Sequence, residues 1–356
     1  MSWIRAILGR IKGSVAATVV VSSALFGTIS GSSVATVSAI GNMMLPEMLK
    51  AGYDKKYSAS LIAASGFIGI LIPPSIPGVM YGVVAGVPIA DVWLSTASAG
   101  VLVTIAYIIY NRIFFANQET MPTEKFTVKG YFSGIKQTSA RAVVALLMPV
   151  IIFVGVYGGI LTPTEAGAVA VAYGLLAGWV IYPLLFRDKD NVGFVEVTKK
   201  SAVTTATISI LIGFAAIASA MFTYGGSATI LANWLLGITE NPIVFLLVVN
   251  LVLLLVGMFM ETNTAILLLA PILVPAAKAY GIDPIHFGAI MLLNLEIGMI
   301  TPPFASNLFV ACKISNLTLD QLLKPILGFI VVCIPILLII TYVPDVALFF
   351  VHLIGN

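Results

Sequence analysis

Two stretches decide how this chain folds. Residues 69–77 read GILIPPSIP, and residues 294–303 read NLEIGMITPP. In both, a Pro-Pro pair begins four residues after a glycine. Proline lacks a backbone N–H donor and clashes with the preceding helical turn, so each pair predicts a break in a helix. Each break would leave carbonyl oxygens without a helical partner, and these oxygens would be free to bind something else.

The rest of the chain is strongly apolar. Of its 356 residues, 60% are hydrophobic and only 9% are charged, against about 25% charged in a soluble domain. The mean hydropathy is +1.08. We therefore expect an all-α polytopic membrane protein surrounded by a lipid bilayer. The net charge of +3 is small and no basic tract exceeds a short loop cluster, so no nucleic-acid partner is expected.

Hydrophobic stretches place the membrane segments. A full span needs about 20 apolar residues, and the candidates are 92–111, 141–159, 164–186, 201–223 and 325–350. Shorter or interrupted stretches are 13–29, 34–49, 57–72 with 75–87, 242–259, 264–280, and 285–300 with 304–313. The segment 227–238 is short enough to lie along the membrane surface.

Basic residues sort the connections between these segments. Three connections, near 87–91, 160–163 and 224–241, contain no Lys or Arg, and the positive-inside rule places them outside. The basic connections, and residues 1–12 before the first segment, are placed in the cytoplasm. Their basic residues are Arg5, Arg10, Lys12, Lys50, Lys55, Lys56, Arg112, Lys125, Lys129, Lys136, Arg141, Arg187, Lys189, Lys199 and Lys200.

This topology predicts two re-entrant hairpins. Segments 13–29 and 34–49 leave the inside and return to it, and each is too short to span comfortably. Their tip would lie near Ser30–Ser33. The second pair of short segments, 242–259 and 264–280, has both feet outside and would place its tip near Glu261–Thr264.

The two hairpins belong to an internal repeat. When the sequence is shifted by 229 positions, seven of the 29 residues from 46 to 74 are identical, where roughly two are expected by chance. The identical pairs are Pro46 and Pro275, Gly52 and Gly281, Asp54 and Asp283, Ile68 and Ile297, Gly69 and Gly298, Pro73 and Pro302, and Pro74 and Pro303. Copies that enter from opposite sides form an inverted repeat, a transporter design with its binding sites near the bilayer midplane.

The residues at the four breaks suit a cation and an anion. Small hydroxyl residues at the first tip, with carbonyls freed by proline, supply the oxygens that Na⁺ prefers. The second tip and its partner break add two carboxylates, Glu261 and Glu296. Carboxylates at membrane depth are costly and usually functional, although a structural role for Glu296 is equally consistent with its position. Half-helix N-termini would favour an anionic substrate.

One further carboxylate has a different explanation. Glu165 follows Thr162-Pro163-Thr164 at the start of an apolar stretch. Either threonine could cap a helix there, and Glu165 would favour the positive end of the helix dipole. We therefore interpret Glu165 as part of a helix N-terminus.

Five motifs together resemble one family. They are SGSS at 30–33, IPPSIP at 72–77, TPTEA at 162–166, GMFME at 257–261, and NLEIG at 294–298 running into TPP at 301–303. They resemble the large membrane subunit, DctM-like, of tripartite ATP-independent periplasmic (TRAP) transporters, and the resemblance runs from about residue 5 to residue 350. It implies an elevator-type secondary transporter in a bacterial inner membrane that imports small organic anions, such as C4-dicarboxylates or sialic acid, with a Na⁺ gradient. It also implies a small membrane subunit and a periplasmic substrate-binding protein as partners.

The family's motifs carry site residues onto this sequence. The resemblance implies one Na⁺ site at Ser30, Ser32, Ser33, Gly69, Pro73 and Ser75. It implies a second at Glu261, Thr262, Asn263, Thr264, Gly298 and Thr301, where Glu261 stands in a position that is often Asp. The substrate is expected between the tips, at Ser75, Pro74, Asn263, Pro303 and Asn307. No cofactor other than the coupling ion is expected.

The repeats and the resemblance divide the chain into four parts. Residues 1–91 and 242–313 would form the transport domain, 92–241 the scaffold and connecting helices, and 314–356 a C-terminal transmembrane helix. The family usually carries two more helices before the first hairpin, whereas only twelve residues precede it here. A misassigned start and a shortened form both remain open.

Three alternatives to Na⁺-coupled import stay open at this point. Proton coupling would use Glu261 or Glu296 as the titrating group. An intramembrane enzyme is disfavoured because neither carboxylate has a nearby His, Ser–Lys pair or metal cluster in the sequence. A truncated subunit that does not transport is the third.

Overall fold

The computed structural model of the chain describes residues 4, 13–115, 128–186, 193–226 and 241–354. These residues form helices joined by turns and contain no strand, which confirms the predicted all-α class. The helices in chain order are α2 (Ser14–Ser30), α3 (Ser33–Lys50), α4 (Lys55–Gly66), α5 (Ile68–Leu71), α6 (Ile76–Ala85), α7 (Ile89–Phe115), α8 (Val128–Tyr157), α9 (Pro163–Leu176), η1 (Ala177–Ile181), α10 (Tyr182–Phe186), α11 (Phe194–Tyr224), α13 (Pro242–Phe259), α14 (Thr262–Ala279), α15 (Pro284–Gly298), α16 (Ser306–Ser315), α17 (Leu319–Tyr342), α18 (Pro344–Ala347) and α19 (Phe349–Ile354).

Within this described part, six helices are long and apolar enough to cross a membrane. A seventh span arises if Lys55–Leu71 and Ile76–Ala85 count as one, because they meet at a 46° bend across the first Pro-Pro pair. The polytopic membrane fold is therefore confirmed. The arms α13 and α14 have 18 residues each, or about 27 Å of helix, so their re-entrant character stays a prediction.

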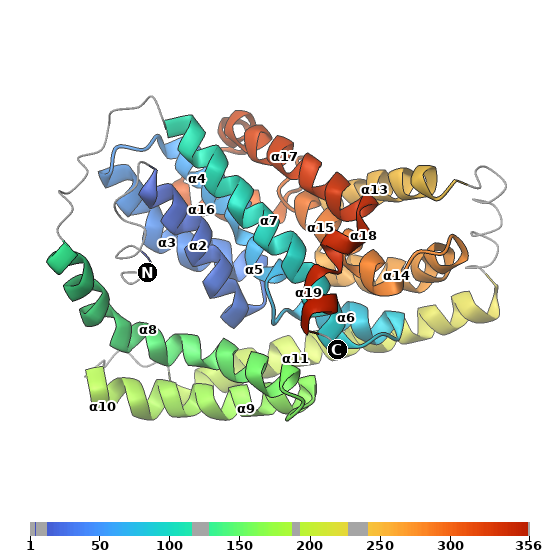
Figure 1. Cartoon of the computed structure of the whole chain (residues 1–356), viewed down its shortest axis with the longest axis horizontal. Helices are drawn as coiled ribbons and strands as arrows, with labels where there is room; N and C mark the ends of the chain where they lie inside the picture. Colours follow the sequence, from blue (N-terminus) through green and yellow to red (C-terminus); the bar gives the residue numbers. More distant parts are fainter. Residues whose placement is uncertain (1–3, 5–12, 116–127, 187–192, 227–240, 355–356) are drawn as a thin grey trace.

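Element bounds repeat along the chain. α14 begins and ends 229 residues after α3, and α15 begins 229 residues after α4. Figure 1 shows α2 and α3 at one end of the long axis and α13 and α14 at the other, with both tips toward the middle. The opposite membrane orientation of the two halves stays a prediction.

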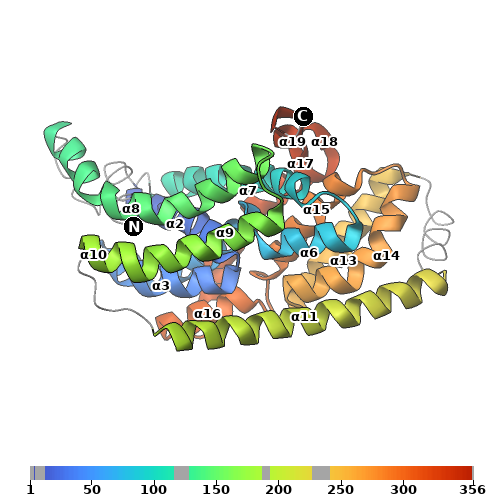
Figure 2. The same cartoon turned by 90° about the horizontal axis from the view of Figure 1, so that it is seen from below.

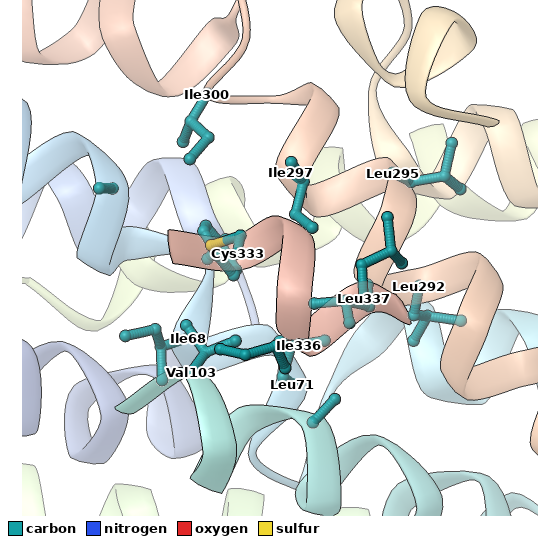
Figure 3. Close-up of a cluster of buried hydrophobic side chains, with 14 of the residues drawn as sticks. Ile68, Leu71, Val103, Leu292, Leu295, Ile297, Ile300, Cys333, Ile336 and Leu337 are labelled. Atoms are coloured by element: carbon teal, nitrogen blue, oxygen red, sulfur yellow. The ribbon is translucent and has the colours of Figure 1, made fainter. Parts of the chain in front are cut away.

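The centre of the molecule is a single apolar core shared by both halves. Figure 3 shows side chains from α5 and α7 meeting side chains from α15 and α17. Ile68, Val103, Leu292 and Ile297 have no exposed surface. In a bilayer such side chains stabilise the fold mainly by close van der Waals packing, so this cluster holds the two broken helices together.

The helices from α8 to α11 lie outside this core. α8, α9 and α10 run along one face, and α11 extends along the long axis beside α14 (Figures 1 and 2). In the most apolar stretch of α11, 0% of the residues are buried inside the molecule, and in that of the α9–α10 span the share is 6%. Apolar helices with so little burial suit lipid or a partner helix as neighbours.

The predicted C-terminal span of 325–350 is wrong at its end. α17 stops at Tyr342, and the chain turns into the short helices α18 and α19. Pro344 explains the end, because the residue before a proline is pushed out of the α region. The predicted surface segment 227–238 lies outside the described residues.

Candidate functional site

Gly31 turns the chain at the first hairpin tip. Its φ is +61°, a left-handed conformation that glycine adopts without strain. Its N–H donates to the Gly27 carbonyl at 2.7 Å, which ends α2. The Ser32 hydroxyl accepts the Ala35 N–H at 3.4 Å and starts α3. The tip therefore follows from its own sequence, since serine favours the N-cap position.

The oxygens of this tip lie close together. The Ser30 hydroxyl is 3.1 Å from the Thr36 hydroxyl and 3.3 Å from the Ser32 carbonyl. The Thr36 hydroxyl donates to the same carbonyl at 2.8 Å. Ser30 and Ser32 are partly exposed, so this small oxygen cluster remains accessible at the tip.

The first helix break packs against the tip. A Cβ at Gly27 would overlap the backbone of Gly69, and a Cβ at Gly31 would lie 3.2 Å from the Ile76 side chain. The cis peptide bond of Pro73–Pro74 lies between these two contacts in the chain. The structure thus brings the tip beside the break, as the first predicted Na⁺ site requires.

Ser75 fixes the start of the second half of the broken helix. It is 3% exposed, and its hydroxyl accepts the Gly78 N–H at 3.3 Å to cap α6. Its carbonyl accepts the Trp93 indole N–H at 3.1 Å. The N-terminus of α6 therefore lies beside the break, where its partial positive charge would favour an anion.

Glu261 forms the second tip in the place of Ser32. It is the N-cap of α14, and its carboxylate accepts the Thr264 N–H at 3.2 Å and the Asn263 side-chain amide at 2.7 Å. The Glu261 side chain is exposed. A carboxylate at this position favours the helix dipole and leaves further oxygen lone pairs for a cation.

The second break has the same plan. A Cβ at Gly257 would lie 2.7 Å from the Leu295 carbonyl oxygen and 3.1 Å from the Gly298 Cα. The Thr301 hydroxyl donates to the Ile297 carbonyl at 2.7 Å. The Pro302–Pro303 bond is cis. The residues of the second predicted Na⁺ site therefore lie on one tip and the break that contacts it.

Both tips meet at Glu296 and Met299. Glu296 is 0% exposed, and its Oε1 accepts the Thr262 hydroxyl at 2.7 Å. The Thr262 hydroxyl also lies 3.1 Å from the Met299 sulfur, and the Ser33 hydroxyl of the first tip lies 3.8 Å from the same sulfur. This junction joins tip residues of the two halves.

Several buried side-chain polar atoms in the described part of the chain have no hydrogen-bond partner within the protein. They include one carboxyl oxygen of Glu296 and both side-chain polar atoms of Asn307. Buried polar groups are nearly always hydrogen-bonded, so these atoms point to a ligand or to water. Among the described residues, the side chains with such an atom are Ser22, Ser23, Ser65, Ser98, Asn263, Asn294, Glu296 and Asn307.

The predicted substrate residues are less closely joined than the predicted cation residues. Ser75 and Asn307 are buried, Pro74 is partly buried, and Pro303 is exposed. Ser75, Asn263 and Asn307 share no hydrogen bond in the described structure. The Asn307 N–H donates to the Met299 carbonyl at 3.3 Å, which places the start of α16 beside the second break.

Sequence reasoning missed Met299 and the buried Asn294. Asn294 donates to the Asn250 side chain at 2.6 Å, and Asn250 donates to Thr341 at 3.0 Å. Polar side chains within long apolar helices were the available signal. The helix start predicted at Glu165 is confirmed, because Thr162 and Glu165 form a capping box with each other's backbone N–H.

Comparisons with known proteins agree with this architecture. A family model described as "Tripartite ATP-independent periplasmic transporter, DctM component" matches residues 1–346. The chain is 38% identical to the isethionate TRAP transporter permease protein DctMQ of Oleidesulfovibrio alaskensis, covering 96% of this chain and 53% of that protein. It is 35% identical to the sialic acid TRAP transporter large permease protein SiaM of Vibrio cholerae, covering 97% of this chain and 79% of that protein.

A third relative is a C4-dicarboxylate TRAP transporter large permease protein, also from Vibrio cholerae. The identity is 37%, over 96% of this chain and 78% of that protein. The chain thus spans about half of the DctMQ protein and more than three quarters of the other two. The chain therefore belongs to the DctM component family of the tripartite ATP-independent periplasmic transporters, which makes it a multi-pass permease of the bacterial inner membrane and not an enzyme.

Proposed function

We propose that this chain imports a small organic anion by Na⁺-coupled secondary transport. The observation that carries the proposal is the pairing of each hairpin tip with a Pro-Pro helix break, through Gly27 on Gly69 and Gly257 on Gly298. Each pair gathers hydroxyl, carbonyl or carboxylate oxygens beside interrupted backbone. Hard oxygen donors of this kind suit a small monovalent cation, and a broken helix at membrane depth is tolerated where it lines a site.

The anionic substrate is proposed from two features. α6 and α16 both begin beside a break, so their N-termini offer positive charge and N–H groups. The names of three relatives specify isethionate, sialic acid and C4-dicarboxylate, which are all small organic anions. We expect the substrate to contact Ser75, Asn263 and Asn307, with Pro74 and Pro303 at the edge of its site.

Two partners follow from membership of a tripartite system. A periplasmic binding protein would deliver the substrate, and a small membrane subunit would pack beside the large one. The DctMQ name of one relative is consistent with a large and a small subunit joined in one chain. The exposed apolar face of α11 is available for lipid or for such a subunit.

Uptake in proteoliposomes tests the coupling ion. The chain, its small subunit and its binding protein are reconstituted, and radiolabelled C4-dicarboxylate or sialic acid uptake is measured with an inward Na⁺ gradient at constant pH. We expect uptake only with the Na⁺ gradient. Equal uptake with a K⁺ gradient would overturn Na⁺ coupling.

Variants of the two tips test the proposed Na⁺ sites. Ser32→Ala and Glu261→Ala should each raise the Na⁺ concentration for half-maximal uptake about tenfold, equivalent to about 1.4 kcal/mol of lost binding. Both residues also cap helices. Asp54→Ala and Asp283→Ala are matched controls, because they remove the N-caps of α4 and α15 at the opposite ends of those helices from the breaks.

The two control variants distinguish the effect of losing a helix cap from the effect of losing a Na⁺ ligand. Asp54→Ala and Asp283→Ala should lower thermal stability while leaving the Na⁺ response unchanged. An unchanged Na⁺ response in Ser32→Ala and Glu261→Ala would show that the site assignment is wrong. An altered response in all four variants would show that helix capping, and not ligation, governs the effect.

Proton coupling is a second candidate because Glu296 is fully buried. Among the described residues it forms no ion pair, and one of its oxygens has no hydrogen-bond partner. Removing an isolated charge from water costs several kcal/mol, so this group is expected to hold either a proton or a bound cation. If a proton is transported, uptake should follow an imposed pH gradient without Na⁺, and Glu296→Gln should abolish that response.

A further inference from the structure

Glu296 and Met299 lie where the two hairpin tips meet. Thr262 of the second tip donates to the Glu296 Oε1 at 2.7 Å, and the same hydroxyl lies 3.1 Å from the Met299 sulfur. The Ser33 hydroxyl of the first tip lies 3.8 Å from that sulfur. Glu296 belongs to α15, the helix that breaks at the second Pro-Pro pair, and Met299 is the C-cap residue of the same helix. The end of one helix thus contacts both hairpin tips.

The two hydroxyls occupy the same place in the repeat. Ser33 is the first residue of α3 and Thr262 is the first residue of α14, and they are 229 residues apart. Each directly follows the N-cap of its helix, Ser32 or Glu261, which is a predicted cation ligand. A shift of either hydroxyl would therefore move the adjacent ligand.

In the described structure this carboxyl group has no counterpart in the first half. The position 229 residues before Glu296 is Phe67, a fully buried apolar residue. Ser33, Thr262, Glu296 and Met299 are all buried. Because protein interiors are closely packed, a movement of one tip is transmitted through these side chains to the other tip.

We propose that Glu296 is a positioning residue that, through Thr262 and Met299, ties the two hairpin tips together and so couples the two cation sites. The mechanical link stands on the contacts described here, whereas the coupling of cation binding rests on the proposed function. The role requires Glu296 to accept a hydrogen bond and does not require it to exchange a proton. Glutamine retains an oxygen acceptor and has nearly the same size, so Glu296→Gln should preserve the link between the tips. Glu296→Ala should lose it.

Hydrogen exchange of the full chain purified in detergent tests the mechanical link. In Glu296→Ala, we expect amides in both tip segments, 28–36 and 258–266, to exchange on the order of tenfold faster, because the link that opposes local opening is lost. Glu296→Gln should exchange as the unchanged protein does. Amides of α9, which lies outside the core, serve as the internal reference.

Thr262→Val gives the sharper measurement because it deletes one hydroxyl and keeps the side-chain shape. If the tips are linked through Glu296, Thr262→Val should speed amide exchange in the first tip, 28–36, although Thr262 belongs to the second tip. Ser33→Ala should likewise loosen the second tip. Faster exchange confined to the tip that carries the substitution, or no change in either, would overturn the proposal.

The Na⁺ response tests the coupling. We expect Na⁺-dependent uptake to be cooperative in the unchanged transporter, with a Hill coefficient that falls toward 1 in Glu296→Ala and is kept in Glu296→Gln. An unchanged Hill coefficient in Glu296→Ala would overturn the coupling. If the unchanged transporter shows no Na⁺ dependence, the proposed function fails and the coupling with it, and the exchange measurements alone decide the link between the tips.

Discussion

Two pairs of glycines determine how closely each hairpin approaches the helix that follows it. Gly27 lies on Gly69 in the first half, and Gly257 lies on Gly298 in the second. The neighbouring atoms at both contacts belong to backbone, which cannot rotate away as a side chain can. These positions therefore have no room for any side chain.

Adding one methyl group at the first contact should destabilise the protein. We expect Gly27→Ala to lower the free energy of unfolding by about 1–3 kcal/mol, because the core is overpacked against the Gly69 backbone. Thermal unfolding in detergent measures the effect. Gly174→Ala in α9 is the matched control, since nothing lies within 4 Å of its Cβ position. That control should keep or raise the stability, and equal losses in both variants would contradict the role of the glycine contact.

Sequence reasoning found the residues of the tips but not all of their partners. Glu296 was identified because a carboxylate is unusual within an apolar segment, whereas Ser33 and Thr262 were identified through the family's motifs. Met299 was missed, since a methionine in such a segment gives no signal until its neighbours are known. The contact of Glu296 with Thr262 was not predicted either, because the two residues are more than thirty positions apart in the sequence.

At the scale of helices, the start of α9 was predicted from its cap, whereas an end inside an apolar run was not. Thr162 accepts the Glu165 backbone N–H, as its position before an apolar stretch indicated. The structure adds N-caps at Asp54 and Asp283, which the sequence indicated only as equivalent repeat positions. The end of α17 was predicted too late because hydropathy stays high after Tyr342. Pro344 held the needed information, and its effect on the preceding residue outweighs hydropathy.

The capping box of α9 predicts a measurable loss. Thr162→Ala removes the hydroxyl that accepts the Glu165 N–H at 3.3 Å, and we expect it to cost about 0.5–2 kcal/mol of stability. The neighbouring Thr164→Ala removes an exposed hydroxyl that does not cap the helix and should cost less. Chemical denaturation followed by circular dichroism compares the two. A larger loss for Thr164→Ala would contradict the assignment of Thr162 as the cap.

At the scale of the whole molecule, the duplication was visible in the sequence and the shared core was not. The offset of 229 residues fixed the correspondence of α3 with α14 and of α4 with α15. The packing of α5 and α7 against α15 and α17 depends on three-dimensional complementarity (Figure 3). Conserved spacing predicts equivalent elements, but it does not predict which faces of those elements meet.

Opposite orientation of the halves can be measured by labelling. Lys56, at the start of α4, and Lys278, at the end of α14, are both exposed. With Cys312 and Cys333 replaced by alanine, we expect Lys56→Cys to react with a membrane-impermeant maleimide only from the cytoplasmic side. Lys278→Cys should react only from the periplasmic side, because the hairpin feet face opposite compartments. Reaction of both from one side would contradict the inverted repeat.

The single carboxyl group that serves both halves also restricts how the duplicated sequence can diverge. Copies of a duplicated segment usually drift independently once each has its own contacts. Here Thr262 of one copy donates to Glu296 and lies beside Met299, which Ser33 of the other copy contacts, and a hydroxyl left buried without an acceptor is costly. A natural sequence that loses the acid at position 296 should therefore also lose the hydroxyl at position 262. Substitutions in one half of the sequence are therefore constrained by the other half through a single buried side chain.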